Sequence, residues 1–202
     1  SNFDAVIATG GELASNQFKK YLELKPGLIR SHRNSVGVLT GMETDEDLEA
    51  LGMDVFSYYG LGCRNVSKIY IPKSFDVRRL PEVFDHRYAY VMDLHRYAHN
   101  YDFQLAAMLI NRLVFLQGET VLLRPSGKLY ANIATLNYEY YDDLEGLCRD
   151  LSAQEDHIQV VSVNVEIDFP RTCRLGEAQW PELHDYQDGI DVIRFLRQLQ
   201  ID

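Results

Sequence analysis

The sequence has few cysteines, little positive charge and no long apolar run, and each shortage excludes a class of protein. Three cysteines without a C-x-x-C pair match neither a disulfide framework nor a zinc site, which predicts a reducing, cytoplasmic setting. Twenty Lys and Arg against 30 Asp and Glu give a net charge of −10, which disfavours a nucleic-acid partner. Uncharged stretches reach only about ten residues, half the length of a membrane-spanning helix. No secretory signal opens the chain. We therefore expect neither a nucleic-acid partner nor a membrane span.

The remaining composition is that of an ordinary globular protein. The chain has 202 residues, of which 46% are hydrophobic and 25% charged. A chain of this length buries roughly 70% of the surface that its unfolded form exposes, so its core needs no metal or disulfide. One or two domains are expected.

Strand-like and helix-like segments alternate along the chain. The apolar pattern predicts strands over 3–9, 35–40, 66–71, 119–123, 130–136 and 158–165. It predicts helices over 12–24, 45–59, 76–90, 102–116, 144–151 and 190–199. Thr44 is the expected N-cap of the second helix, with three acidic residues following it. This alternation predicts an α/β fold, a three-layer sandwich with a mostly parallel sheet.

Cys63 is the candidate nucleophile. It follows Gly60-Leu61-Gly62 in a loop between a predicted helix and a predicted strand. Glycines let the backbone approach a substrate closely, and backbone N–H groups in such a turn can stabilise an oxyanion. The plainer interpretation is a small buried hydrophobic residue. The carboxyl end of the preceding helix opposes thiolate formation, so activation has to come from Arg64, Lys68 or a more distant group.

Three segments place the chain near a known family. Ala8-Thr9-Gly10 follows the first strand, and the segment Phe56–Pro72 reads FSYYGLGCRNVSKIYIP, with Asp76 opening a further helix. Near the end, Ala178–Asp191 reads AQWPELHDYQDGID. In these motifs the sequence resembles the aldehyde dehydrogenase superfamily and, within it, the LuxC-type acyl-CoA reductases. The resemblance extends over nearly the whole chain.

The resemblance implies a chemistry and a domain organisation. Cys63 corresponds to the nucleophile that attacks an acyl-CoA thioester, and NADPH or NADH then releases the acyl group as an aldehyde. Residues 1–25 would be the trailing strand and helix of a nicotinamide-binding domain that lies mostly upstream, and residues 26–202 the catalytic thiol domain. Gly10 and Gly11 would lie near the cofactor phosphates, although an ordinary strand-to-helix turn explains them equally well from the residues alone. Homo-oligomers are typical of the superfamily.

The sequence departs from the wider superfamily at two motifs. The general-base Glu of L-E-L-G-G has no counterpart in Leu28-Ile29-Arg30-Ser31-His32. A reductase has no use for this Glu, because a base that activates water would hydrolyse the acyl-enzyme. The ribose-binding Glu of E-I-F-G-P is also missing, and Lys128–Asn132 occupies its place.

Other interpretations stay open. The chain could be a non-catalytic interaction domain that keeps the fold, or a thioesterase or acyltransferase in which His32 serves as the base for Cys63. His95, His99 and Asp102 have the spacing of one helical face, but we expect a solvated face or a histidine pair rather than a metal site, because Asn100-Tyr101 argues against a continuous helix. Cys148 is expected in the core, and Cys173 has no assigned role.

Overall fold

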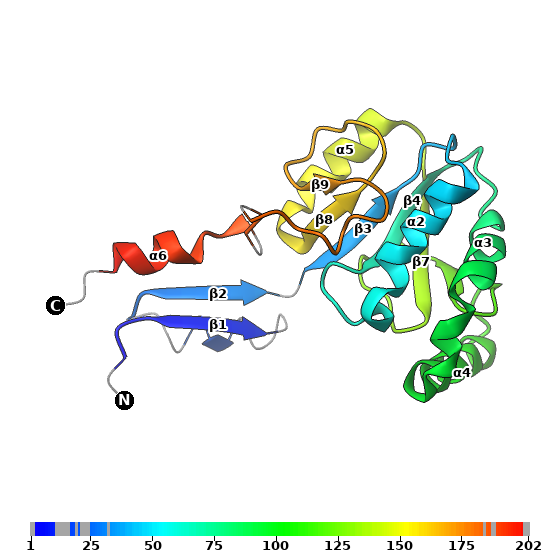
Figure 1. Cartoon of the computed structure of the whole chain (residues 1–202), viewed down its shortest axis with the longest axis horizontal. Helices are drawn as coiled ribbons and strands as arrows, with labels where there is room; N and C mark the ends of the chain where they lie inside the picture. Colours follow the sequence, from blue (N-terminus) through cyan, green and yellow to red (C-terminus); the bar gives the residue numbers. More distant parts are fainter. Residues whose placement is uncertain are drawn as a thin grey trace. The chain divides into compact units, whose positions relative to one another are not determined.

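The computed structural model describes residues 3–10, 17–18, 20, 25–31, 33–183, 185–186 and 189–199 (Figure 1). The chain divides into two compact units, one of residues 1–33 with 181–202 and one of residues 34–180. Among the described residues, no helix is long and apolar enough to cross a bilayer.

In the first unit, two short parallel strands pair side by side (Figure 1). They are β1 (Val6–Gly10) and β2 (Gly27–Ser31), with Gly10 opposite Ser31. The helix predicted between them falls mostly outside the described residues. The tail helix is α6 (Val192–Gln198), which begins where the side chain of Asp191 accepts a hydrogen bond from the Arg194 N–H.

The second unit is built on a seven-stranded sheet in the order β5-β6-β7-β4-β3-β8-β9. The strands are β3 (Asn34–Val38), β4 (Val66–Pro72), β5 (Leu116–Gln117), β6 (Leu122–Pro125), β7 (Thr135–Tyr141), β8 (Ile158–Ser162) and β9 (Thr172–Cys173). Every pairing is parallel except that of β5 with β6. The predicted α/β class with a mostly parallel sheet is confirmed.

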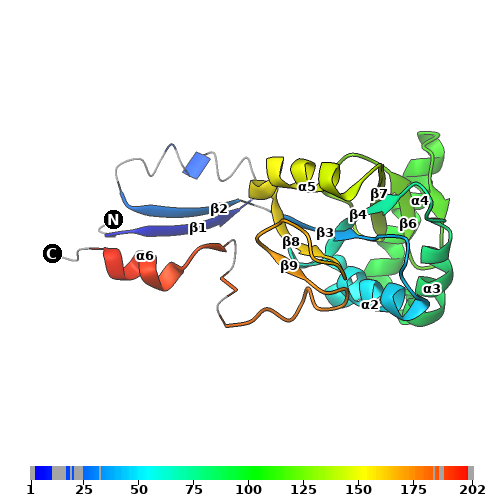
Figure 2. The same cartoon turned by 90° about the horizontal axis from the view of Figure 1, so that it is seen from above.

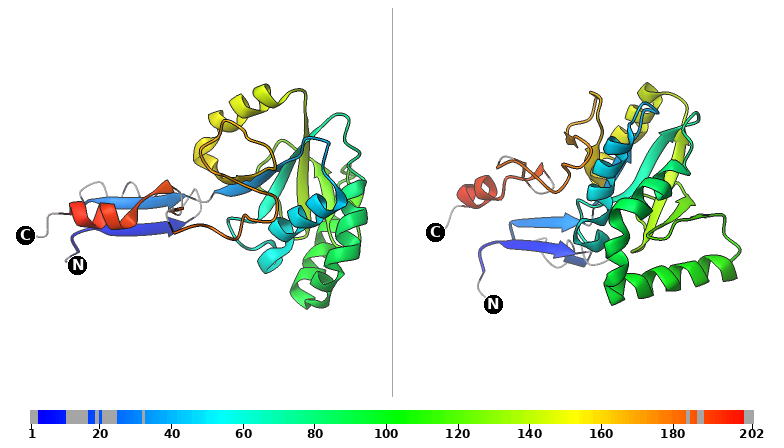
Figure 3. Two further views of the ribbon diagram at one scale, coloured as in Figure 1. Left: turned by 45° about the horizontal axis from the view of Figure 1, so that its top comes forward. Right: turned by 45° about the vertical axis from the view of Figure 1, so that its right-hand side comes forward.

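Helices cover both faces of this sheet (Figure 2). They are α2 (Asp45–Phe56), α3 (Arg79–Tyr88), α4 (His95–Ile110) and α5 (Leu144–Ala153), with 3-10 turns at Ser57–Gly60, Ala89–Asp93 and Glu155–His157. One core contains buried residues of α2, α3 and α4, and the other contains those of α5. The left view of Figure 3 shows α5, in yellow, apart from α2, α3 and α4. The three layers predicted from the sequence are present.

Side chains alternate between the two faces of the sheet along β4, so this one strand contributes residues to both cores. Ile69 and Ile71 belong to the core under α2 and α3, while Tyr70 between them belongs to the core under α5. Thr44 caps α2 as predicted, in a reciprocal capping box with Asp47. These local signals are reliable because neighbouring residues alone produce them.

Three predicted elements need correction. The helix expected over 102–116 runs over His95–Ile110 and passes through Asn100-Tyr101 without a break. Tyr97 and Tyr101 are buried on its inner face, and their hydroxyls donate to the carbonyls of Thr120 and Gly118, so the tyrosines are core residues and not loop residues. The strands expected at 119–123 and 130–136 begin later, and they pair in parallel because the loop 126–134 returns the chain to the starting edge.

Candidate functional site

Cys63 lies on a tight loop between the 3-10 turn that ends α2 and the start of β4. Its side chain is half-buried. The loop is therefore at the amino end of a parallel strand, whereas ligands of open α/β sheets more often bind at the carboxyl ends. This edge is also where β7 begins, so the segments that precede the two strands are neighbours.

The backbone before Cys63 is strained. Tyr58, Tyr59 and Gly60 have φ values of 50°, 58° and 74°, three successive residues in the left-handed region. A residue with a side chain costs about 1–3 kcal/mol in such a conformation, and strain of this kind concentrates at functional sites. Tyr59 is held by packing, with its ring centroid 6.4 Å from that of Tyr97. The turn redirects the chain from α2 to residues 61–65, the loop that carries Cys63, which we call the thiol loop.

Asn65 fixes the shape of the thiol loop. Its buried side chain donates Nδ2 to the carbonyls of Asp54, Val55 and Ser57 at 2.9, 3.2 and 2.7 Å. Its Oδ1 accepts the Gly62 N–H at 2.8 Å. A Cβ on Gly62 would lie 2.9 Å from that oxygen, so glycine is required there. One amide side chain thus closes the end of α2 and holds the residue before Cys63.

The carbonyl of Cys63 is fixed by a hydrogen bond, whereas its N–H is available to a ligand. The Cys63 carbonyl accepts a hydrogen bond from the hydroxyl of buried Ser35, at 2.9 Å. Among the described residues, no acceptor is recorded for the backbone N–H of Cys63 or of Arg64. Two adjacent unpaired donors beside a thiol are the arrangement that can stabilise an oxyanion on a carbonyl bound to that sulfur.

Of the two cations considered as activators of Cys63, Lys68 is excluded. It is 1% exposed, and its Nζ donates to the Gly127 carbonyl and Glu139 and lies 4.4 Å from the centroid of the Tyr70 ring. Arg64 donates Nε to the carbonyl of Ala178, which holds the guanidinium group against the segment after β9.

A buried carboxylate that the sequence analysis missed supports this segment. Asp54 is fully buried in α2 and accepts hydrogen bonds from the Ser162 hydroxyl at 2.6 Å and from the N–H groups of Gly176 and Ala178 at 2.8 and 2.9 Å. Burial raises the pKa of Asp54, and the three hydrogen bonds oppose that rise. The signal in the sequence that could have revealed this role is an acidic residue beside the apolar positions of the predicted helix.

The three cysteines do not differ simply in exposure, because each is half-buried. Burial, with a smaller contribution from Asp54, raises the pKa of Cys173 to about 12, so its thiol is protonated at neutral pH. Cys148 of α5 is half-buried and is not among the residues of the core under that helix, contrary to expectation. The preferential reactivity of Cys63 stays a prediction.

The other candidate residues fall into two groups. Gly10 ends β1, but Gly11 and His32 lie outside the described residues, so the phosphate-binding turn and the alternative base stay predictions. His95 and His99 do share a face of α4, with ring centroids 5.6 Å apart. Within the described ranges, no three His, Cys, Asp or Glu side chains come together as a metal site.

The loop 126–134 packs beside the thiol loop. Ser67 of β4 donates its hydroxyl to the Leu129 carbonyl at 2.8 Å. A small cavity of about 30 Å³ is lined by Gly60 and Asn65 on one side and by Ala131–Thr135 on the other. The segment Lys128–Asn132, which the resemblance puts near the place of E-I-F-G-P, therefore lies beside Asn65 and Ser67.

Comparisons with known proteins establish the fold. No family model matches the sequence, and no curated protein does. Similar solved structures include aldehyde dehydrogenase 21 from Physcomitrella patens, at 12% identity and a TM-score of 0.54 over 82% of this chain and 40% of that one. An NADP-dependent glyceraldehyde-3-phosphate dehydrogenase from Bacillus halodurans is 18% identical, with a TM-score of 0.55 over 80% of this chain and 39% of that one.

A third similar structure is the proline utilization A protein of Bradyrhizobium japonicum, at 13% identity and a TM-score of 0.61 over 83% of this chain and 20% of that one. The chain thus spans about 40% of the length of the aldehyde dehydrogenases that it matches. Its second unit has the mixed, mostly parallel architecture of an aldehyde dehydrogenase catalytic domain. At these identities the likeness is one of fold.

Proposed function

We propose that this chain is the catalytic portion of an NAD(P)H-dependent acyl-CoA reductase, with Cys63 as its nucleophile. The observation that carries the proposal is the thiol loop, where a half-buried cysteine follows a strained turn and two adjacent N–H groups have no recorded acceptor. The aldehyde dehydrogenase fold and the G-L-G-C motif support it.

The first step transfers the acyl group to the protein. The Cys63 thiolate attacks the thioester carbonyl carbon, and the carbonyl oxygen gains negative charge beside the N–H groups of Cys63 and Arg64. The bond from carbon to the CoA sulfur then breaks, and CoA leaves as a thiolate that takes up a proton. Ser35 and Asn65 hold the loop during this step because both bind its backbone.

The second step reduces the Cys63 thioester to an aldehyde. The acyl carbon accepts a hydride, the bond from that carbon to Sγ breaks, and Cys63 returns to the thiolate. A reduced nicotinamide supplies the hydride when bound, and acyl-CoA, NAD(P)H and one proton give aldehyde, CoA and NAD(P)⁺ overall. NADP is the ligand in the Bacillus halodurans structure, and we propose NADPH or NADH here, with Gly10 and Gly11 near its phosphates.

Hydrolysis of the acyl-enzyme would compete with reduction. Leu28–His32, the segment that the resemblance puts in the place of the general-base motif L-E-L-G-G, contains no carboxylate. A positioned general base contributes about 10²–10⁴-fold, so without one the thioester should persist long enough to be reduced.

The test is a mass measurement on the protein after incubation with acyl-CoA, followed by product analysis. We expect one acyl group on Cys63, none in Cys63→Ser, and unchanged acylation in the matched control Cys148→Ser. Aldehyde should form only when NADPH or NADH is present. Rapid release of free acid without nicotinamide would refute the reductase and favour the thioesterase. No acylation of any cysteine would refute the nucleophile and favour an interaction domain.

A further inference from the structure

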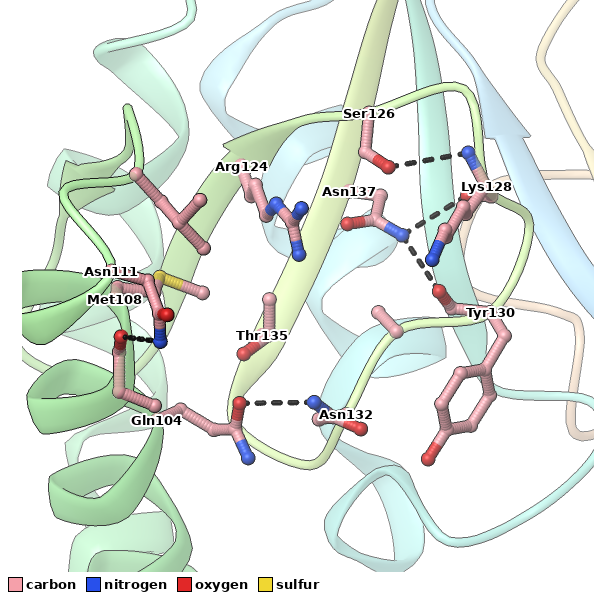
Figure 4. Close-up of a pocket in the computed structure, with 13 residues that line it drawn as sticks. Gln104, Met108, Asn111, Arg124, Ser126, Lys128, Tyr130, Asn132, Thr135 and Asn137 are labelled. Atoms are coloured by element: carbon pink, nitrogen blue, oxygen red, sulfur yellow. Dashed lines mark hydrogen bonds between the residues drawn. The ribbon is translucent and has the colours of Figure 1, made fainter.

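A larger cavity lies on the other side of the loop 126–134 from the thiol loop. Its volume is about 250 Å³, and it shares Ala131, Asn132 and Thr135 with the small cavity that Gly60 and Asn65 line. Figure 4 shows it framed by α4, by β6 and β7, and by the loop between them.

The wall of this cavity is positively charged in an otherwise acidic protein. Arg124 of β6 and Lys128 of the loop are its charged lining residues, and no Asp or Glu lines it, although the chain has a net charge of −10. Among the described residues, neither the Arg124 guanidinium nor the Lys128 ammonium has a recorded hydrogen bond or ion pair. Figure 4 shows both side chains reaching toward the enclosed space.

Neutral polar groups on the wall add to this chemistry. The Thr135 hydroxyl oxygen is buried and has no hydrogen-bond partner among the described residues. A buried hydroxyl without a partner costs about 1–3 kcal/mol. A hydroxyl can donate to an anion, so an anionic ligand would supply the missing partner.

Hydrogen bonds hold the loop that carries Lys128 in place. Asn137 of β7 donates Nδ2 to the carbonyls of Lys128 and Tyr130 at 3.0 and 2.8 Å. Asn132 donates to Gln104 of α4 at 2.9 Å, and the Lys128 N–H donates to the Ser126 hydroxyl at 3.2 Å. The site is therefore organised before a ligand arrives, which lowers the entropy lost on binding.

From the charge, the unpartnered donors and the fixed loop, we propose that this cavity binds a phosphoryl group. An Arg guanidinium binds phosphate oxygens in a bidentate manner, and Lys adds a second positive charge. The volume lies below the range of about 300–1,000 Å³ that encloses a whole drug-sized ligand. The cavity therefore suits the phosphorylated end of a longer molecule.

This inference does not require Cys63 to be catalytic. If the proposed function also holds, two reactants carry suitable groups, the nucleotide part of acyl-CoA and that of NADPH or NADH. The cavity shares Ala131, Asn132 and Thr135 with the small cavity that Gly60 and Asn65 line, so the two cavities border the same stretch of the loop 126–134.

The test compares inorganic pyrophosphate, CoA and NADPH as ligands of the chain, by calorimetry or NMR titration at low ionic strength. We expect Arg124→Ala to weaken pyrophosphate binding at least tenfold, and Lys128→Ala to weaken it severalfold. Arg124→Lys should recover part of the loss, since it restores the charge without the bidentate geometry. Arg149→Ala removes an equal charge from an exposed ion pair on α5 and should leave affinity within twofold.

The outcomes separate this proposal from that on Cys63. Cys63→Ser should bind pyrophosphate as the unmodified chain does, whether or not Cys63 becomes acylated. A larger loss of CoA affinity than of NADPH affinity in Arg124→Ala identifies CoA as the source of the phosphoryl group, and the opposite result identifies the nicotinamide cofactor. Equal pyrophosphate binding by the unmodified chain and Arg124→Ala would overturn the proposal, as would no binding of any of the three ligands.

Discussion

Replacing Asn65 should destabilise the protein and loosen the loop that carries Cys63. Asn65→Ala removes four hydrogen bonds, three donated by Nδ2 to carbonyls at the end of α2 and one accepted from the Gly62 N–H. A typical hydrogen bond contributes about 0.5–1.5 kcal/mol net, and water can reach part of this loop, so we expect a loss of about 3 kcal/mol. For a chain of this size that lowers Tm by roughly 6–12 °C.

Asn65→Asp should be worse than Asn65→Ala at neutral pH. The aspartate keeps an acceptor for the Gly62 N–H but places a carboxylate oxygen against three carbonyl oxygens, in a site that is 4% exposed. Burying an uncompensated charge is more unfavourable than losing the hydrogen bonds. Protonation removes that charge, so the difference between the two variants should shrink as the pH falls toward about 4.

The assay is urea unfolding of both variants across this pH range, with acylation of Cys63 measured well below each Tm. Asn100→Ala is the matched control, because this half-buried asparagine makes one recorded side-chain hydrogen bond, to the Arg96 carbonyl one turn earlier in α4, and its loss should change stability by less than about 0.5 kcal/mol. Asn65→Ala with the stability of the unmodified chain, or Asn65→Asp more stable than Asn65→Ala at pH 7, would refute this account of the loop.

Four further predictions follow from the same structure. Alkylation followed by mass spectrometry at pH 8 should label Cys63 before Cys173, since burial raises the pKa of Cys173 to about 12; faster labelling of Cys173 would contradict this. Burial raises the pKa of Asp54, so the folded protein binds that proton more tightly than the unfolded chain, and stability should fall as the pH rises from about 4, by at most about 1.4 kcal/mol per unit. In urea unfolding, the stability of Asp54→Asn should not fall in this way as the pH rises. A pH profile identical to that of the unmodified chain would contradict this prediction. Gly52→Ala should lose about 1–3 kcal/mol or more in the same assay, because the new Cβ would lie 2.2 Å from Tyr88 Cε2, and an unchanged midpoint would show that the ring moves freely. Calorimetry should show NADPH binding to the 202-residue chain no tighter than about 1 mM, and micromolar binding that persists in Arg124→Ala would place the full cofactor site within these residues.

Sequence patterns identified the elements whose signals are local. The helix after Thr44 has its capping box and apolar face within a dozen residues, and β4 has an apolar run at Ile69–Ile71 that Pro72 ends, so both were predicted close to their observed bounds. α4 was predicted several residues late, because Tyr97 and Tyr101 count as semi-polar until carbonyls of a distant loop satisfy their hydroxyls. The parallel pairing of β6 and β7 depends on the loop 126–134, of which the sequence signals only a short turn at Pro125-Ser126-Gly127.

The sequence by itself determined the α/β class, the position of Cys63 in a glycine-bounded loop and the absence of a carboxylate from β2. Each of these depends on residue type and spacing along a short stretch of chain. Only the tertiary structure decided that Asn65 binds the backbone of the thiol loop and that Lys68 forms an ion pair with Glu139. It also decided that Arg124 and Lys128 line one cavity. The partner of a side chain depends on which distant segments the order of strands in the sheet brings together. Local sequence therefore does not distinguish a charged residue that is paired within the protein from one that is available to a ligand.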